Sequence, residues 1–142
     1  MLIICINILN NVETNGTAIL INSNTVIDYL SGKILSKGKV FMDKVINNIP
    51  NISVLTKIKV LGFKTKESAN HLLKGFIDGS VGFGLSDKIV EITIEIMKEY
   101  KIKTPDAVVA ATALQSNLAL INNDARGFKN IKGLDIINPH ES

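Results

Sequence analysis

The feature that most constrains the fold is a repeated alternation of short apolar runs with longer segments of helical periodicity. The runs at 18–21, 52–55, 118–121 and 135–137 are rich in Ile, Leu and Val and are too short for helices, which favours buried strands. Between them, the segment 86–100 repeats apolar residues at helical spacing. Strands that alternate with helices predict an α/β protein, a three-layer α/β/α sandwich with a central parallel sheet.

The remaining segments fit the same pattern. Helices are predicted over 26–30, 39–49, 57–61, 66–75 and 105–114, and the glycine-rich residues 75–84 are predicted to form a turn, a short strand and another turn. Thr56 is expected to cap the third of these helices. Pro105 and Asp106 open the last one, because proline suits the first turn and an acid is stabilised at the positive end of the helix dipole.

Length and composition indicate one domain with an aliphatic core. The chain has 142 residues, and we expect residues 1–16 to form an N-terminal extension or an extra strand before a domain at 17–142. Apolar residues make up 46% and aromatic residues 5%, as in a parallel sheet buried on both faces. The apolar start, Met1 to Leu9, lacks a basic leader and is shorter than the roughly 20 residues of a membrane span. A soluble cytoplasmic protein without a membrane partner is predicted.

Composition also excludes several kinds of site. The only cysteine, Cys5, cannot form an intramolecular disulfide or a cysteine-based zinc cluster. His71 and His140 are isolated and have no metal-ligand spacing. The net charge of +3 is spread along the chain and is not by itself evidence of nucleic-acid binding.

Polar clusters follow two of the predicted strands, at 22–25 and 122–124. In parallel sheets, ligands bind at the carboxyl ends of the strands, so these clusters mark the candidate site. The residues alone leave simpler roles open. Asp106 after proline is a common helix-start acid, and Asp124 in an Asn-Asn-Asp sequence suits a turn.

Four motifs in order give the chain a family resemblance that covers residues 17–139. The segment 105–113, Pro-Asp-Ala-Val-Val-Ala-Ala-Thr-Ala, resembles a motif of PIN domains, especially of the VapC-type toxin ribonucleases. The segment 21–30 resembles the opening Asp-(Ser/Thr)-Asn motif of that family. Residues 52–62 resemble its second strand and the helix with its glutamate, and residues 118–128 its last strand.

The resemblance implies a metal-dependent endoribonuclease that cleaves RNA, with Mg²⁺ or Mn²⁺ held by a cluster of acids. Such hard cations require several oxygen ligands. Asp106 and Asp124 match two of the acidic positions, as catalytic and metal-binding residues, and Asn24 and Asn123 match supporting positions. The resemblance also implies a homodimer and an antitoxin protein as a possible partner.

The sequence departs from the family at the acidic positions themselves. Asn22 stands where the family has its first acid, and Lys59 stands where it has the glutamate. The late acid falls on Asp124, although an alternative alignment places it on Gly127. Met97 stands where many relatives carry a basic residue. The site is three charges more positive than the family pattern, one from Asn22 and two from Lys59. We therefore predict weakened or lost catalysis and little or no bound magnesium at millimolar concentration.

Other interpretations remain open from the sequence. The chain could be a non-catalytic module that binds RNA or an antitoxin. It could also be a phosphoryl-accepting receiver domain, but that fold needs paired acids where the chain has Asn22, Ser23 and Asn24. The Lys59 ammonium could replace the cation by pairing with Asp106 or Asp124, or it could point into solvent.

Overall fold

The structure is a computed structural model that describes residues 19–34, 36–47, 49–128 and 130–139. The extension expected at 1–16, together with Cys5 and His140, lies outside the described residues. The strands are β1 (Ile19–Ile21), β2 (Asn51–Ser53), β3 (Val81–Phe83), β4 (Ala119–Ile121) and β5 (Ile136–Ile137). The helices are α2 (Ser23–Leu30), α3 (Ser36–Asn47), α4 (Val54–Leu61), α5 (Glu67–Asp78), α6 (Asp87–Glu99), α7 (Thr104–Gln115) and the short 3-10 helix η1 (Ala125–Phe128).

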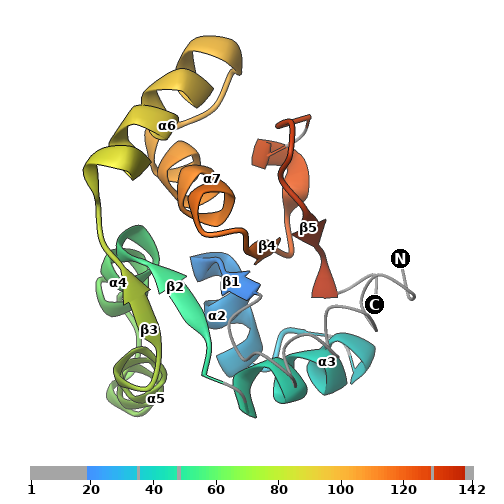
Figure 1. The fold of residues 1–142 in the computed structure, drawn as a ribbon. Coiled ribbons are helices and arrows are strands. Elements are labelled where there is room, and N and C mark those ends of the chain that lie inside the picture. The colour runs from blue at the N-terminus through green and yellow to red at the C-terminus, as the bar shows by residue number, and fades with distance from the viewer. Residues whose placement is uncertain (1–18, 35, 48, 129, 140–142) are drawn as a thin grey trace.

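The five strands form one parallel sheet in the order β3-β2-β1-β4-β5 (Figure 1). The central pair is in register, with Leu20 opposite Leu120 and Ile21 opposite Ile121. Because β1 and β4 are neighbours and run parallel, the residues that follow them, from 22 and from 122, emerge at the same edge of the sheet. The order of the strands therefore brings together two segments about 100 residues apart in sequence.

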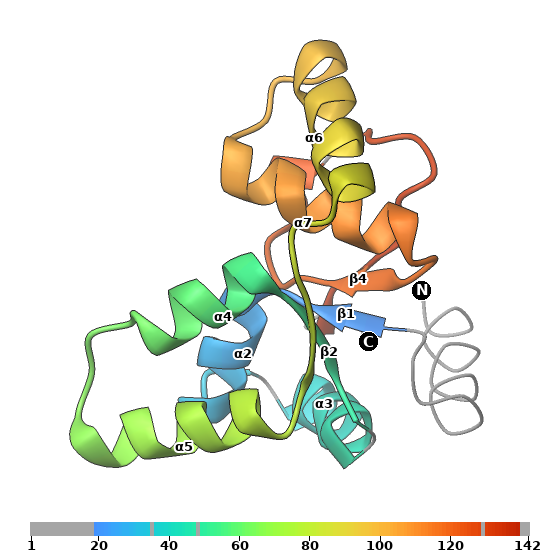
Figure 2. The ribbon, with the colours of Figure 1, turned by 60° about the vertical axis from the view of Figure 1, so that its left-hand side comes forward.

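Helices cover both faces of the sheet, which confirms the predicted three layers. In Figure 2, α6 and α7 lie on one side of the sheet, and α2, α3 and α5 lie on the other. Ile19 and Ile21 point into the core under α2, α3 and α5, whereas Leu20 and Leu120 point into the core under α6 and α7. The alternation follows from the two-residue period of a strand, and both faces are apolar because both are covered.

The helix α7 has the longest buried stretch of the described helices. Seven consecutive residues, Ala107 to Ala113, are buried. Small side chains dominate that stretch, so the helix packs closely between the sheet and α6, with which it shares its most extensive helix contact. This close packing fixes the position of the first turn of α7, where Asp106 lies.

Several boundaries differ from the prediction by two or three residues, and the one between β2 and α4 has a clear cause. The strand β2 ends at Ser53, and α4 begins at Val54 instead of after Thr56. The Ser53 hydroxyl accepts a hydrogen bond of 3.0 Å from the backbone N–H of Leu55 and caps the helix, while Thr56 is buried within the first turns. Serine and threonine are both good N-cap residues, and Ser53 caps α4 because it is the residue at which β2 ends. None of the helices in the described ranges is long and apolar enough to cross a membrane.

Candidate functional site

Two asparagines join the carboxyl ends of β1 and β4. The Asn22 side chain caps α2, with Oδ1 accepting a 2.9 Å hydrogen bond from the backbone N–H of Ser23. Its Nδ2 donates to Oδ1 of Asn122 over 3.4 Å. Both asparagines are buried, Asn22 at 5% exposure and Asn122 at 0%. The position expected for the first acid is therefore a helix cap and one half of a buried amide pair.

Asn24 and Asn123, the expected supporting residues, belong to the same polar junction. The Thr25 hydroxyl donates to Oδ1 of Asn24 over 3.2 Å and accepts from the backbone N–H of Asn123 over 3.1 Å. The Asn123 side chain donates to the carboxylate of Asp28 on α2. These bonds hold the loop after β4 against the start of α2.

Asp106 lies in the first turn of α7 and is partly buried. Its carboxylate forms no hydrogen bond or ion pair with the described residues. A Cβ atom at Gly127 would lie 3.1 Å from Oδ2 of Asp106. Position 127, the alternative place for the late acid, therefore faces Asp106 directly.

Asp124 is bound to a neighbouring arginine. The Arg126 guanidinium donates two hydrogen bonds to its carboxylate, from Nε at 2.9 Å and from a terminal nitrogen at 2.8 Å. The backbone N–H of Arg126 adds a third, at 3.2 Å. These bonds favour the charged carboxylate and lower the pKa of Asp124 from 3.8 to about 2. Both oxygens of the Asp124 carboxylate therefore accept hydrogen bonds from Arg126.

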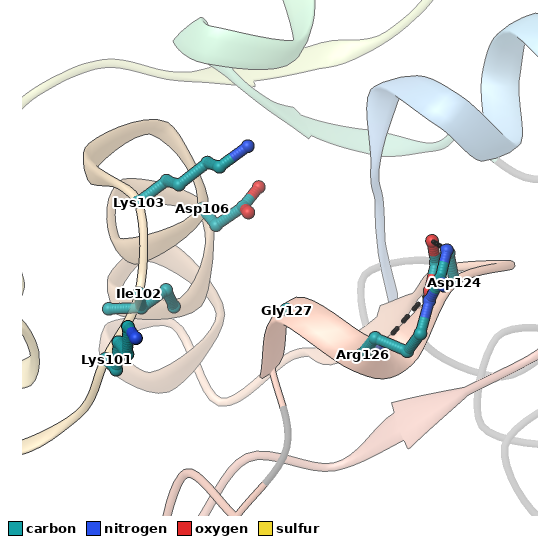
Figure 3. Close-up of a pocket in the computed structure, with 7 residues that line it drawn as sticks. All are labelled: Lys101, Ile102, Lys103, Asp106, Asp124, Arg126 and Gly127. Atoms are coloured by element: carbon teal, nitrogen blue, oxygen red, sulfur yellow. Dashed lines mark hydrogen bonds and ion pairs between the residues drawn. The ribbon is translucent and has the colours of Figure 1, made fainter.

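Asp106 and Asp124 line one open pocket of about 540 Å³. Figure 3 shows them on opposite sides of it, with Gly127 between them and their carboxylates not aimed at each other. The lining is completed by Lys101, Ile102, Lys103, Arg126 and Gly127. The charged side chains of the lining are three cations and two acids, so the pocket is not an acidic one.

The hypothesis that Lys59 pairs with Asp106 or Asp124 is wrong. Lys59 lies on α4 with an exposed side chain, and it forms no ion pair with the described residues. The inward face of α4 is taken by buried Thr56 and Val60, so Lys59 points into solvent, the alternative left open by the sequence. Arg126 reaches Asp124 from only two residues away, at a smaller entropic cost than a contact between distant segments.

Comparison with known proteins identifies the family. A family model described as PIN domain matches residues 52–134, more than half of the chain. The chain belongs to the PIN domain family. No curated protein matches the sequence at a significant level.

Solved structures agree with this PIN assignment. A chain in the structure of a toxin–antitoxin complex from Klebsiella pneumoniae is 25% identical, with a TM-score of 0.69 and coverage of 85% of this chain and 97% of that one. DNA-bound VapBC from Salmonella typhimurium gives 18% identity, a TM-score of 0.71 and coverage of 87% and 98%. FitAcB from Neisseria gonorrhoeae gives 19% identity, a TM-score of 0.67 and coverage of 87% of this chain and 99% of that one. The protein is a PIN domain that resembles the VapC and FitB toxins in fold.

Nucleases of the PIN family are typically metal-dependent, but the residues of this PIN domain do not fit a divalent cation. The described residues contain no group of three or more His, Cys, Asp or Glu side chains that could hold one. Asp124 is already bound by Arg126, and Oδ1 of Asn22 is used as a helix cap. Among the described residues that line the pocket, Asp106 alone has an unpaired carboxylate, which gives too few charged oxygens for a hard cation.

Two features of this PIN site could not be read from the sequence. Arg126 forms an ion pair with Asp124, and its spacing of two residues from that acid is the only sequence signal that could have suggested it. The sequence marks Asn122 only as a residue that follows a strand, and its contact with Asn22 depends on the order of the strands.

Proposed function

We propose that this PIN domain derives from a toxin-type, metal-dependent endoribonuclease, and that its own cleavage of RNA is weakened or lost. The proposal rests on one observation about the pocket. Of its two acids, Asp124 is neutralised by Arg126, and only Asp106 keeps a free carboxylate. Asn22 and Lys59 occupy two further positions at which the family resemblance implies acids.

The size of the electrostatic deficit supports this proposal. At about 4 Å and an effective dielectric constant near 20, one carboxylate attracts a divalent ion by about 8 kcal/mol before desolvation is counted. Because Lys59 is exposed, solvent screens its repulsion, and the lost carboxylates matter more than the added ammonium. We expect no specific binding of magnesium or manganese at millimolar concentration.

The contact between Gly127 and Asp106 suggests a third missing acid. A side chain at 127 would point at Asp106, whereas Asp124 points at Arg126. We therefore place the late acidic position of the family at Gly127, and we infer that three of four acids are absent.

A second candidate function is metal-free binding of RNA or of an antitoxin. The observation that favours it is the set of cations around the pocket, Lys101, Lys103 and Arg126. Lys101 and Lys103 form no ion pair with other described residues, so their charges are available to a phosphate group. Relatives of similar fold were crystallised as toxin–antitoxin complexes and as complexes bound to DNA. The same cations would oppose a partner that inserts an arginine or lysine.

A cleavage assay tests the proposal. The wild-type protein, the Asn22→Asp/Lys59→Glu double variant and the triple variant that adds Gly127→Asp are each incubated with end-labelled RNA and Mn²⁺. Each of the three proteins has two controls: the same protein with Asp106→Asn added, and a reaction in which EDTA replaces Mn²⁺. Cleavage that appears only in a repaired variant and disappears with Asp106→Asn is the expected result.

The other outcomes separate the two functions. Mn²⁺-dependent cleavage by the wild-type protein that requires Asp106 would show a working enzyme and refute the charge argument. If no variant cleaves but wild-type protein binds RNA in EDTA, with an affinity that falls as salt rises, the binding function is the better one.

A further inference from the structure

The side-chain amide of Asn22 is used at both ends, although the residue stands where an acid is expected. Its oxygen accepts from Ser23, and its nitrogen donates to Oδ1 of Asn122. Both residues are buried, because Asn22 is 5% exposed and Asn122 is fully buried. Each end of the amide thus has a protein partner in a place with little access to solvent.

The orientation of Asn122 is fixed from its other side. Its Nδ2 donates to the backbone carbonyl of Asp124. Turning the amide over would place Oδ1 against that carbonyl and leave two acceptors facing each other. The oxygen of Asn122 must therefore face position 22, and the residue at position 22 must supply a donor.

A carboxylate at position 22 would fail this requirement. It could still cap α2, since Oδ1 keeps its place, but its second oxygen would meet Oδ1 of Asn122 across 3.4 Å, with no proton between them. A buried charged acceptor that faces another acceptor is costly. A protonated carboxyl group, in contrast, could donate as the amide does.

We infer that Asn122 and Asn22 form a neutral amide junction that has replaced the acidic edge of the site, and that Asn122 excludes a carboxylate from position 22. The inference rests on the proposed function for the view that an acid once stood there, but its physical content depends only on the hydrogen bonds. Asn122 is then a further determinant of the site. Restoring the first acid in its charged form without a loss of stability then calls for a hydroxyl at 122, which can rotate to donate to a carboxylate.

The test is a double-mutant cycle in metal-free buffer with EDTA. The folding equilibrium constants of wild type, Asn22→Asp, Asn122→Ser and the double variant are measured by urea unfolding from acid to neutral pH. Asn24→Asp is the matched control, because Asn24 uses only its oxygen, as an acceptor from Thr25. The same chemical change at position 24 should leave the folding constant within about threefold of wild type, as expected for a substitution that removes no buried contact.

At neutral pH, Asn22→Asp should lower the folding constant by about tenfold to a hundredfold relative to wild type, the range expected for an unmet buried acceptor. The junction raises the pKa of the new carboxyl in the folded state, so the deficit is absent in acid and grows as pH rises through that pKa. In the Asn122→Ser background, Asn22→Asp should lower the folding constant by less than about threefold.

The inference is overturned if Asn22→Asp folds as stably as wild type at neutral pH, or if its deficit is equal in both backgrounds. If the single variant does not fold at neutral pH, its recovery in acid still decides the question. Because neither metal nor RNA is present, RNA cleavage by wild type would refute the proposed function without changing this result.

Discussion

Gly127 offers a direct test of the proposal that the late acidic position of the family lies there. A Cβ at this position would lie 3.1 Å from Oδ2 of Asp106, and the backbone has no positive φ that would oppose a side chain. The Asp106 carboxylate can move away by a few tenths of an ångström, because it is the free end of a side chain. Gly127→Asp should therefore fold and place a second carboxylate beside Asp106.

The expected cost follows from the separation. From standard bond lengths, the two carboxylates would lie roughly 4 to 5 Å apart. Two like charges at that distance repel by about 4 kcal/mol at an effective dielectric constant near 20. Because Asp106 is only partly buried, solvent screening should reduce the net destabilisation to about 1 to 2 kcal/mol.

Urea unfolding of Gly127→Asp and of the neutral control Gly127→Asn measures this repulsion. Both variants share the new Cβ contact and the loss of glycine, so only the charge differs. The repulsion raises a carboxyl pKa in the folded state, so the difference should be absent below about pH 4 and should grow as pH rises through the raised pKa. Millimolar Mn²⁺ should reduce it at neutral pH. Equal stability of the two variants at neutral pH would show that position 127 does not face Asp106.

Three further predictions concern other contacts. Arg126→Gln removes the group that lowers the pKa of Asp124 to about 2. In this variant, NMR titration should find the pKa of Asp124 closer to 3.8. An unchanged low pKa would contradict the ion pair between the two residues. Burial and the Asp43 carboxylate raise the pKa of Tyr29 to about 12. The free energy of unfolding should therefore fall as pH rises from about 10 to 12, and Tyr29→Phe should abolish that fall. A phenolate absorbance signal for Tyr29 near pH 10 would refute this prediction. Gly38→Ala places a Cβ 2.6 Å from two neighbouring atoms and should lower the free energy of unfolding by about 2 kcal/mol in urea; a neutral effect would refute the close contact.

The fold could be predicted because its signals are local. Apolar runs such as 118–121 have the length of a strand, and Pro105 with Asp106 begins α7 at the expected place. Because strands and helices alternate, only a few topologies of a parallel sheet are then possible. The boundary between β2 and α4 was misplaced because Ser53 and Thr56 compete as caps, and only docking of the strand selects one.

The site could be predicted only as a set of positions. The sequence led to Asp106 and Asp124, and both line one pocket. It could not show that Asp124 is bound by Arg126, or that Lys59 points outward, because both depend on the loop after β4 and on the docking of α4. The bond between Asn22 and Asn122 joins residues 100 positions apart and follows from the sheet order alone.

The division between core and site explains how the fold can be kept in a site that, as we propose, lacks several acids. The fully buried side chains of the central strands, Leu20 and Ile21 of β1 and Leu120 and Ile121 of β4, are all aliphatic. In a metal-binding site, a cation would offset the repulsion among several carboxylates at the strand ends. With an amide in place of the first carboxylate, that repulsion is smaller, and Asn22 and Asn122 join the strand ends by an ordinary hydrogen bond. The aliphatic core therefore does not depend on charged groups at the strand ends, and an amide pair can hold those ends together without a cation.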